Sequence, residues 1–314
     1  MTRTRRAVLA GCGATMAALA GCSVGTDDAP QRGWVTVDSP TGAALADVTM
    51  TEYGPVAVGE GGTVVHRADG ADWSVVDEDG PADATNGLTA VAATDDGAHV
   101  WYVGSSGAIG RLRVQTGDVR DYSAPAGKTS TWEAVAVVGA SGSERVAVAN
   151  GSGELLVAQF TGAEPTWEGP SKPTGGDNAV AMDDANGVVF LASQNLVARQ
   201  AGGEWTRIEG PNASITDVAA VSGSVLNATT DGGTIASYNG HNWLRAARVE
   251  RPLTAIDRVE SRGLAVGDGE VRVLSNGAWQ DDDGPDASLR GVALGTARFA
   301  DVAVGTDGTI AERF

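Results

Sequence analysis

The chain has 314 residues, and its 40 Asp and Glu against 22 Lys and Arg give a formal net charge of −18 at pH 7. Proteins bind phosphate backbones through clusters of Lys and Arg, so this composition argues against a nucleic-acid partner. With two cysteines in the whole chain there is no disulfide framework, and the length suffices to bury a large core without one.

The first 21 residues are predicted to be a signal peptide. Arg3, Arg5 and Arg6 make its start positive, and the apolar stretch that follows is shorter than the roughly 20 residues of a membrane-spanning helix. Residues 4–9 contain the pair Arg5 and Arg6 and resemble the twin-arginine export signal. Arginine pairs also occur in ordinary signal peptides, so general secretory export is the alternative.

A lipid attachment site is predicted at Cys22. The run Leu19-Ala20-Gly21-Cys22 resembles the lipobox of lipoproteins, in which the Cys thiol is alkylated with a diacylglyceryl group before cleavage. Cys22 would then begin the mature protein and anchor it to the outer face of the cytoplasmic membrane, and residues 22–32 would form a flexible tether. The alternative is an ordinary signal peptide that contains a Cys.

The predicted mature chain is still more acidic than the whole. Removing residues 1–21 takes away three Arg and no acid, which leaves 19 basic against 40 acidic residues and a net charge of −21. Only Lys128 and Lys172 are lysines. This surface resembles that of proteins from salt-loving archaea, because molar salt shortens the Debye length to about 3 Å and screens the repulsion among carboxylates.

An aromatic residue recurs at nearly constant spacing through the mature chain. The intervals between successive members are 39, 49, 45, 38, 38 and 36 residues. The members are Trp34, Trp73, Tyr122, Trp167, Trp205, Trp243 and Trp279. One aromatic at one position in each repeat is typical of packing between neighbouring repeats.

Proline gives an independent seven-fold count. Seven of the eleven prolines each follow shortly after one of these aromatics, where Pro suits a connection because it cannot donate to a sheet ladder. These seven are Pro40, Pro81, Pro125, Pro170, Pro211, Pro252 and Pro285.

Four strands can be predicted in each unit of about 40 residues, which is the pattern of a β-propeller. The last unit offers only three strands before the chain ends at Phe314, and the segment Trp34–Asp38 has the character of the missing fourth. The sequence therefore predicts an all-β fold over residues 33–314. It is a seven-bladed propeller of four antiparallel strands per blade, with the last blade closed by the N-terminal strand.

Two segments carry a family resemblance. VGEGGTVVHRADGADWSVV (58–76) and TTDGGTIASYNGHNWLR (229–245) resemble BNR/Asp-box repeats and those of the photosystem II assembly and stability factor family, which are exported seven-bladed propellers. YVGSSGAIGRLRVQTGD (102–118) is more similar to a pyrroloquinoline-quinone-type repeat. No unit holds the full Asp-box pattern, so the resemblance implies the fold and not an activity.

Catalytic residue sets are not evident in the sequence. His66, His99 and His241 are predicted at the end of the propeller opposite the loops that join the blades. A Ser in those loops would therefore have no His nearby to act as the base of a catalytic triad. A sialidase-type mechanism would need a Tyr nucleophile beside clustered Arg, and no Tyr is predicted on the loop face. Enzymatic activity is therefore uncertain and not expected.

Binding candidates lie in the loops that join the blades. Asp79 and Asp83 in one loop, and Asp282 and Asp286 in another, could hold Ca²⁺, which prefers several oxygen ligands; the alternative is a hydrated acidic surface. Arg251 and Arg290 could receive an anion, or could form surface salt bridges. Trp132 opens a first strand and is a candidate for ligand stacking, with core packing as the alternative.

The function predicted from these features is non-catalytic. The chain would be an exported, lipid-anchored propeller that binds a protein or small ligand through its loop face and could assist assembly of a membrane or cell-surface complex. Two alternatives stay open: a propeller enzyme of the glycosidase/lyase or quinoprotein type, and a structural cell-surface component. No cofactor other than Ca²⁺ is implied.

Overall fold

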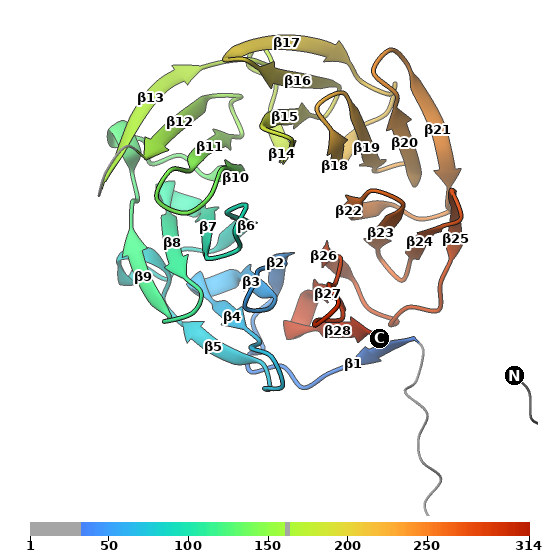
Figure 1. Ribbon diagram of the computed structural model, residues 1–314, viewed down its shortest axis with the longest axis horizontal. Helices are drawn as coiled ribbons and strands as arrows, with labels where there is room; N and C mark the ends of the chain where they lie inside the picture. Colours follow the sequence, from blue (N-terminus) through green and yellow to red (C-terminus); the bar gives the residue numbers. More distant parts are fainter. Residues whose placement is uncertain (1–32, 161–163) are drawn as a thin grey trace, which may run out of the picture. The chain divides into compact units, whose positions relative to one another are not determined.

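The computed structural model describes residues 33–160 and 164–314 and shows a ring of seven four-stranded antiparallel sheets around a central axis (Figure 1). This confirms the predicted seven-bladed β-propeller. The predicted signal peptide with Arg5 and Arg6, the lipid site Cys22 and the tether lie outside the described residues.

In blades 1–6 the strands run from the innermost to the outermost in chain order. Blade 1 consists of β2 (Leu45–Thr49), β3 (Val56–Gly59), β4 (Val64–His66) and β5 (Ser74–Asp77). Blade 2 consists of β6 (Leu88–Ala93), β7 (His99–Gly104), β8 (Ile109–Arg113) and β9 (Asp118–Asp121). Blade 3 consists of β10 (Trp132–Val138), β11 (Arg145–Asn150), β12 (Leu155–Phe160) and β13 (Pro165–Ser171). Blade 4 consists of β14 (Ala179–Ala185), β15 (Val188–Ser193), β16 (Leu196–Ala201) and β17 (Glu204–Glu209). Blade 5 consists of β18 (Ile215–Ser222), β19 (Val225–Thr230), β20 (Thr234–Tyr238) and β21 (Trp243–Arg248). Blade 6 consists of β22 (Leu253–Val259), β23 (Arg262–Gly267), β24 (Val271–Ser275) and β25 (Ala278–Asp281).

Blade 7 joins the two ends of the described chain. Its inner strands are β26 (Leu289–Ala293), β27 (Asp301–Gly305) and β28 (Ile310–Arg313), and its outermost strand is β1 (Trp34–Thr36). Trp34 pairs with Arg313 in the antiparallel register, so the N-terminal strand closes the ring beside the C-terminus (Figure 1). The predicted closure is therefore confirmed.

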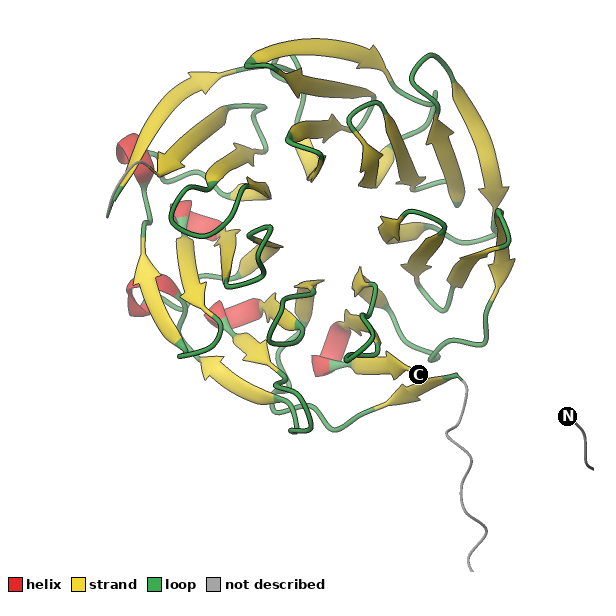
Figure 2. Cartoon of the chain, in the orientation of Figure 1, coloured by secondary structure: helices red, strands yellow, loops and turns green. Residues whose placement is uncertain are grey.

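The two faces of the ring differ in their connections. The loop face carries the connections between blades and the turns between second and third strands, and the hairpin face carries the other turns. Five single 3₁₀ turns belong to the loop face (Figure 2): η1 (Glu60–Gly62), η2 (Pro81–Asp83), η3 (Ser105–Gly107), η4 (Pro125–Gly127) and η5 (Thr306–Gly308). No helix within the described ranges has the length and apolar character needed to cross a membrane.

The recurring aromatics pack between blades, as the spacing predicts, with one difference. Trp73, for example, is 6% exposed and packs on Val302 and Val304 of the preceding blade. In blade 2, however, Val119 occupies the position of the repeat Trp, because it pairs with Leu112 as Trp279 pairs with Leu274. Tyr122 follows the strand and stacks on Trp101 instead, with ring centroids 5.1 Å apart.

Glycines at the ends of second strands allow a close approach of two backbones. A Cβ atom there would lie 2.1–2.2 Å from a carbonyl oxygen of the connection that leads into the same blade. The four are Gly59, Gly104, Gly267 and Gly305. We expect Gly59→Ala to lower the free energy of unfolding by about 3 kcal/mol, because the carbonyl of Ala44 must move.

Urea unfolding measures this effect, and Gly42→Ala is the matched control because no atom lies within 4 Å of the Cβ it would add. An unchanged midpoint for Gly59→Ala would contradict the close-approach argument.

Candidate functional site

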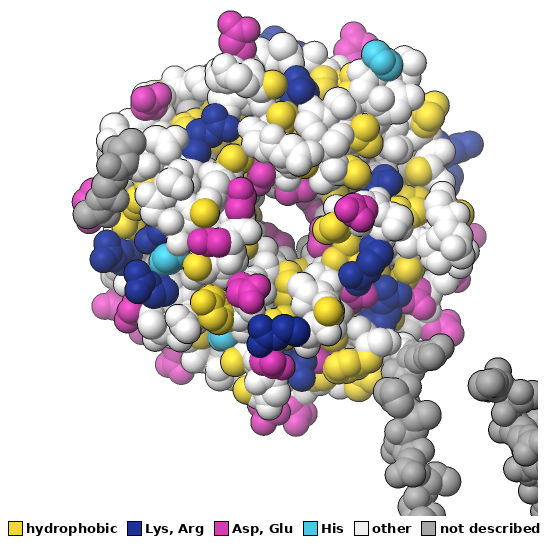
Figure 3. Space-filling view, viewed as in Figure 1, with side chains coloured by type: hydrophobic (Ala, Val, Ile, Leu, Met, Phe, Trp, Pro, Cys, Tyr) yellow, Lys and Arg dark blue, Asp and Glu magenta, His cyan; other side chains and the backbone are white. Residues whose placement is uncertain are grey.

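The seven innermost strands surround an axial channel. Its cavity has a volume of about 310 Å³ and is lined by all seven blades, with Asp47, Asp183, Asp217 and Asp257 among its carboxylates. Acidic side chains are visible around its mouth (Figure 3). The lining also includes Arg290, an exposed side chain on β26.

Every innermost strand carries a bulge at its second residue. The pairing with the second strand skips one residue in each of the seven blades, which turns that side chain and nearby backbone N–H groups away from the blade's own ladder. The bulged residues are Ala46, Thr89, Glu133, Val180, Thr216, Thr254 and Arg290.

Threonine at the bulge links a blade to the next one. The hydroxyl of Thr216 donates to the carbonyl oxygen of Leu253 at 2.7 Å, across the seam between blades 5 and 6. Two other bulged threonines make the same bond: Thr89 to Trp132 at 2.6 Å and Thr254 to Leu289 at 2.7 Å.

Aspartates that follow the bulge form a second set of links. Asp47 accepts the N–H of Val48 at 2.8 Å with one oxygen and the N–H of Val91 in blade 2 at 2.9 Å with the other. The same bond to the next blade is made by Asp183 with Ala220 at 2.7 Å, Asp217 with Ile256 at 2.8 Å and Asp257 with Leu294 at 2.7 Å. These carboxylates therefore hold the ring together.

Burial makes the channel carboxylates weaker acids. Desolvation raises the pKa of Asp47 to about 7 and that of Asp217 to about 8, against the opposing effect of the backbone N–H bonds. Desolvation also raises the pKa of Asp183 and of Asp257, and at Asp183 the neighbouring channel charges of Asp184 and Asp257 act in the same direction.

These shifts predict that the protein becomes more stable as the pH falls from 8 to 5. The pKa of an Asp in the unfolded chain is about 3.9. Above that pH the folded state binds more protons than the unfolded state, so the free energy of unfolding decreases as the pH rises. The decrease ends when the folded carboxyl groups have lost their protons, near pH 7–8. Thermal unfolding at pH 5.5, 7 and 8.5 at fixed salt should show the midpoint falling with pH. Asp217→Asn should reduce this slope, and the exposed-site control Asp283→Asn should retain it. An equal slope in both variants would contradict the assignment.

The seam between blades 7 and 1 is held farther out from the axis. Glu312 of β28 is 0% exposed and accepts the indole N–H of Trp73 at 2.9 Å, and it forms an ion pair with Arg67. Both partners belong to blade 1. Arg290 and Gly291 of blade 7 occupy the positions of Thr216 and Asp217 in blade 5, and Ala293 occupies that of Asp257 in blade 6, so blade 7 makes neither inner link.

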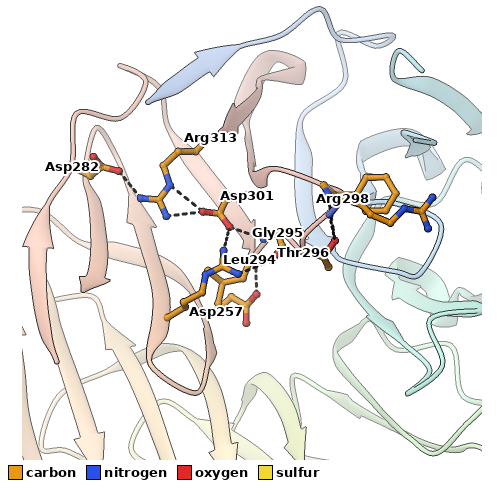
Figure 4. A network of polar contacts seen from close by, with 10 residues as sticks. Asp257, Asp282, Leu294, Gly295, Thr296, Arg298, Asp301 and Arg313 are labelled. Carbon is orange, nitrogen blue, oxygen red and sulfur yellow. Dashed lines mark hydrogen bonds and ion pairs between the residues drawn. The ribbon is translucent and has the colours of Figure 1, made fainter. Parts of the chain in front are cut away.

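A second network joins blades 6 and 7 (Figure 4). Asp301 accepts from Arg313 at 2.6 and 3.0 Å, from Arg262 at 2.7 Å and from the backbone N–H of Gly295 at 2.6 Å. Arg313 also reaches Asp282 at 3.1 Å, so one guanidinium joins the end of blade 6 to the closing blade.

The two arginine candidates have different surroundings. Arg290 lines the channel together with its carboxylates, as expected for the head of a first strand. Arg251 is exposed in the connection between blades 5 and 6, where it donates to the carbonyl oxygen of Asp268 at 3.0 Å. The structure does not bring Arg251 into the channel lining.

Trp132 lies in the core. It is 0% exposed and belongs to the apolar cluster between blades 2 and 3 that includes Trp101 and Phe160. Its ring therefore has no face open to a ligand in this structure. Trp132 is the first residue of β10, and its side chain points into the seam between blades 2 and 3. It is therefore a core-packing residue, which was the alternative to ligand stacking.

The four acidic candidates do not converge. Asp79, Asp83 and Asp286 are exposed, and Asp282 is bonded to Arg313 and to the indole N–H of Trp34, each at 3.1 Å. Within the described ranges no group of three or more His, Cys, Asp or Glu side chains is arranged to hold a metal ion.

Sequence reasoning missed the channel Asp and Thr residues. A signal for them exists in the first strand of several units, where Asp stands beside Val or Ile, as in Asp47-Val48, Asp217-Val218 and Ile256-Asp257. An ionisable residue inside a run of apolar residues that is expected to be central indicates a buried polar link.

No protein-family model matches the chain, and no curated protein matches it in sequence. Solved propellers match it in structure. YCF48 from Cyanidioschyzon merolae superposes with a TM-score of 0.68 and 15% identity over 90% of this chain and 98% of that one. A structure of YCF48 bound to a D1 peptide gives 0.68 and 13% over 90% and 96%. The WD40 β-propeller domain of Doa1 gives 0.69 and 14% over 89% and 96%. At these identities the similarity shows the fold, and the chain has the architecture of a seven-bladed β-propeller.

Proposed function

We propose that this protein is a non-catalytic binding and scaffold propeller that presents its loop face to another protein. In this proposal it is exported, anchored through a lipid on Cys22 to the outer face of the cytoplasmic membrane, and assists assembly of a membrane or cell-surface complex. Its acidic, Lys-poor surface suits an environment of high salt.

The observation that carries the proposal is the use of the channel carboxylates. Asp47, Asp183, Asp217 and Asp257 each accept a backbone N–H of the next blade, so these four carboxylates with raised pKa are structural links. A general acid or base must instead be free to reach a substrate proton. The axis of this propeller is therefore built for rigidity, which suits a scaffold.

Two structural relatives support a protein partner. One is described as YCF48 bound to a D1 peptide, and another belongs to a mitotic checkpoint complex, with a TM-score of 0.70 and 13% identity over 96% of this chain and 99% of that one. The large exposed apolar side chains in the described part are Leu244, Val259 and Phe314, none of which lies in a connection between blades. Recognition by the loop face would therefore be mainly polar.

Site-specific crosslinking tests this proposal. A photoreactive residue is placed at Asp83 or Asp286 on the loop face, and at Asn242 or Asn276 on the hairpin face as matched exposed controls. Membranes are irradiated at high salt, and adducts are identified by mass spectrometry. We expect a reproducible protein adduct from the loop-face positions alone.

Cys22→Ser tests the anchor separately. This variant should leave the membrane fraction and lose the diacylglyceryl mass, and its adduct yield should fall. Equal adduct yields from the two faces, no reproducible adduct, or turnover of a glycan or an alcohol by the purified protein would contradict the binding role.

A further inference from the structure

A pocket opens at the outer part of the seam between blades 2 and 3. Its volume is about 520 Å³, and its lining includes His99, Arg111, Arg113 and Arg120 together with the carboxylate of Asp118 and the apolar side chain of Phe160. Figure 3 shows dark blue side chains gathered beside a His over β8 and β9. A pocket of this size accommodates a small organic molecule.

Strand register explains why these side chains meet. Arg111 pairs with Arg120 across β8 and β9, and His99 pairs with Arg113 across β7 and β8. Paired residues point to the same side of a sheet, and so do residues two apart. One side of blade 2 therefore carries three guanidinium groups, an imidazole and the carboxylate of Asp118 toward blade 3.

This concentration of positive charge is unusual in so acidic a chain. Like charges directly opposite each other destabilise a sheet. Glu144 of blade 3 is 0% exposed and forms an ion pair with Arg111 at 2.6 Å. The exposed carboxylate of Asp118 lies opposite Arg113 in the strand pairing and accepts the hydroxyl of Thr116 at 2.7 Å, so the two carboxylates leave a surplus of positive charge. The side chains of Arg113 and Arg120 are exposed, and within the described ranges neither forms an ion pair.

Two buried polar atoms of the pocket residues also lack a partner. Nδ1 of His99 and Nε of Arg111 have no hydrogen bond, and the two residues are only 7% and 9% exposed. Burying such a polar atom without a partner costs free energy, and native structures keep few of them. Both features, the surplus of positive charge and the unpartnered polar atoms, point to an anion as the missing partner.

We propose that this pocket binds a small organic oxyanion, a carboxylate or a phosphate ester. Arg113 and Arg120 hold its charged group beside His99, and Phe160 contacts its apolar part. A guanidinium suits either anion because its N–H groups match two oxygens at once. The site lies away from the loop face and does not depend on the proposed protein partner.

Titration of the purified protein with three probes tests the proposal. Inorganic phosphate, phenyl phosphate and benzoate are added at constant ionic strength and chloride, and the imidazole NMR resonances of His99 are followed, with His66 and His241 as internal references. We expect a saturable shift of His99 alone. The two aromatic probes should bind more tightly than inorganic phosphate, because only they have a ring that reaches Phe160.

Variants assign the binding to the arginines. Arg113→Gln and Arg120→Gln change exposed side chains, so they should fold, and each should weaken binding about tenfold. Arg245→Gln removes the same charge from an exposed site on the outer strand of blade 5 and should bind as the unmodified protein does.

The order of affinities identifies the source of the charge. Tighter binding of phenyl phosphate assigns a phosphate ester, and tighter binding of benzoate assigns a carboxylate; either supports the proposal. It is overturned if no probe gives a saturable shift, or if both pocket variants bind every probe as tightly as Arg245→Gln.

Discussion

A chain that lacks residues 1–38 is expected to lose about 5 kcal/mol of unfolding free energy relative to one that lacks only residues 1–32. The additional residues include β1, which supplies the outermost strand of blade 7. Its loss removes the packing of Trp34, the indole bond to Asp282 at 3.1 Å, and ladder bonds such as that from Val37 N–H to the carbonyl of Ile310 at 3.0 Å.

This comparison isolates the closing strand, because both shortened chains lack the predicted leader, Cys22 and tether. Urea unfolding followed by Trp fluorescence gives the two midpoints. Exposing the edge of β28 should also promote association, since unpaired edges attract other strands. Equal midpoints and equal solubility would show that closure by β1 does not contribute to the stability of the ring.

Replacing Glu312 with Ala is expected to destabilise the protein by about 4 kcal/mol. Glu312 is completely buried, and its removal leaves the indole N–H of Trp73, itself 6% exposed, and the guanidinium of Arg67 without their acceptor. The effect should be large because the seam between blades 7 and 1 has neither of the inner Thr and Asp links that join blades 5, 6 and 7.

Two further variants define the cause. Glu312→Gln keeps an acceptor for Trp73 and loses the charge facing Arg67, so it should be destabilised less than Glu312→Ala. Glu204→Ala removes an exposed carboxylate at the start of β17 and should unfold at the midpoint of the unmodified protein. If Glu312→Ala behaved like Glu204→Ala, apolar contacts alone would hold this seam.

Most of the fold could be predicted because its determinants are local and repeated. Four strands, an aromatic residue and a proline recur in nearly every unit, and the incomplete last unit with Trp34 predicts the closure. The exception was blade 2, where Tyr122 lies near the expected spacing but outside the strand. Only the pairing of Val119 with Leu112 shows which residue occupies the Trp position, because register depends on both strands.

The candidate sites depended on information that local patterns do not contain. Trp132 looked accessible at the head of a strand and is buried by the neighbouring blade. Asp282 looked like a metal ligand in a loop, and instead bonds to Arg313 and Trp34 from distant parts of the chain.

By itself the sequence determined the number of blades, the strand that closes the ring and the predicted export and lipid signals, since each is written in a contiguous segment or in a repeat. Only the tertiary structure decided how charges are used. Bulges aim the channel aspartates at the next blade, and register sets Arg111 and Arg113 beside Arg120. A seam joins residues of two blades, so the partner of each polar group is fixed only when the ring forms.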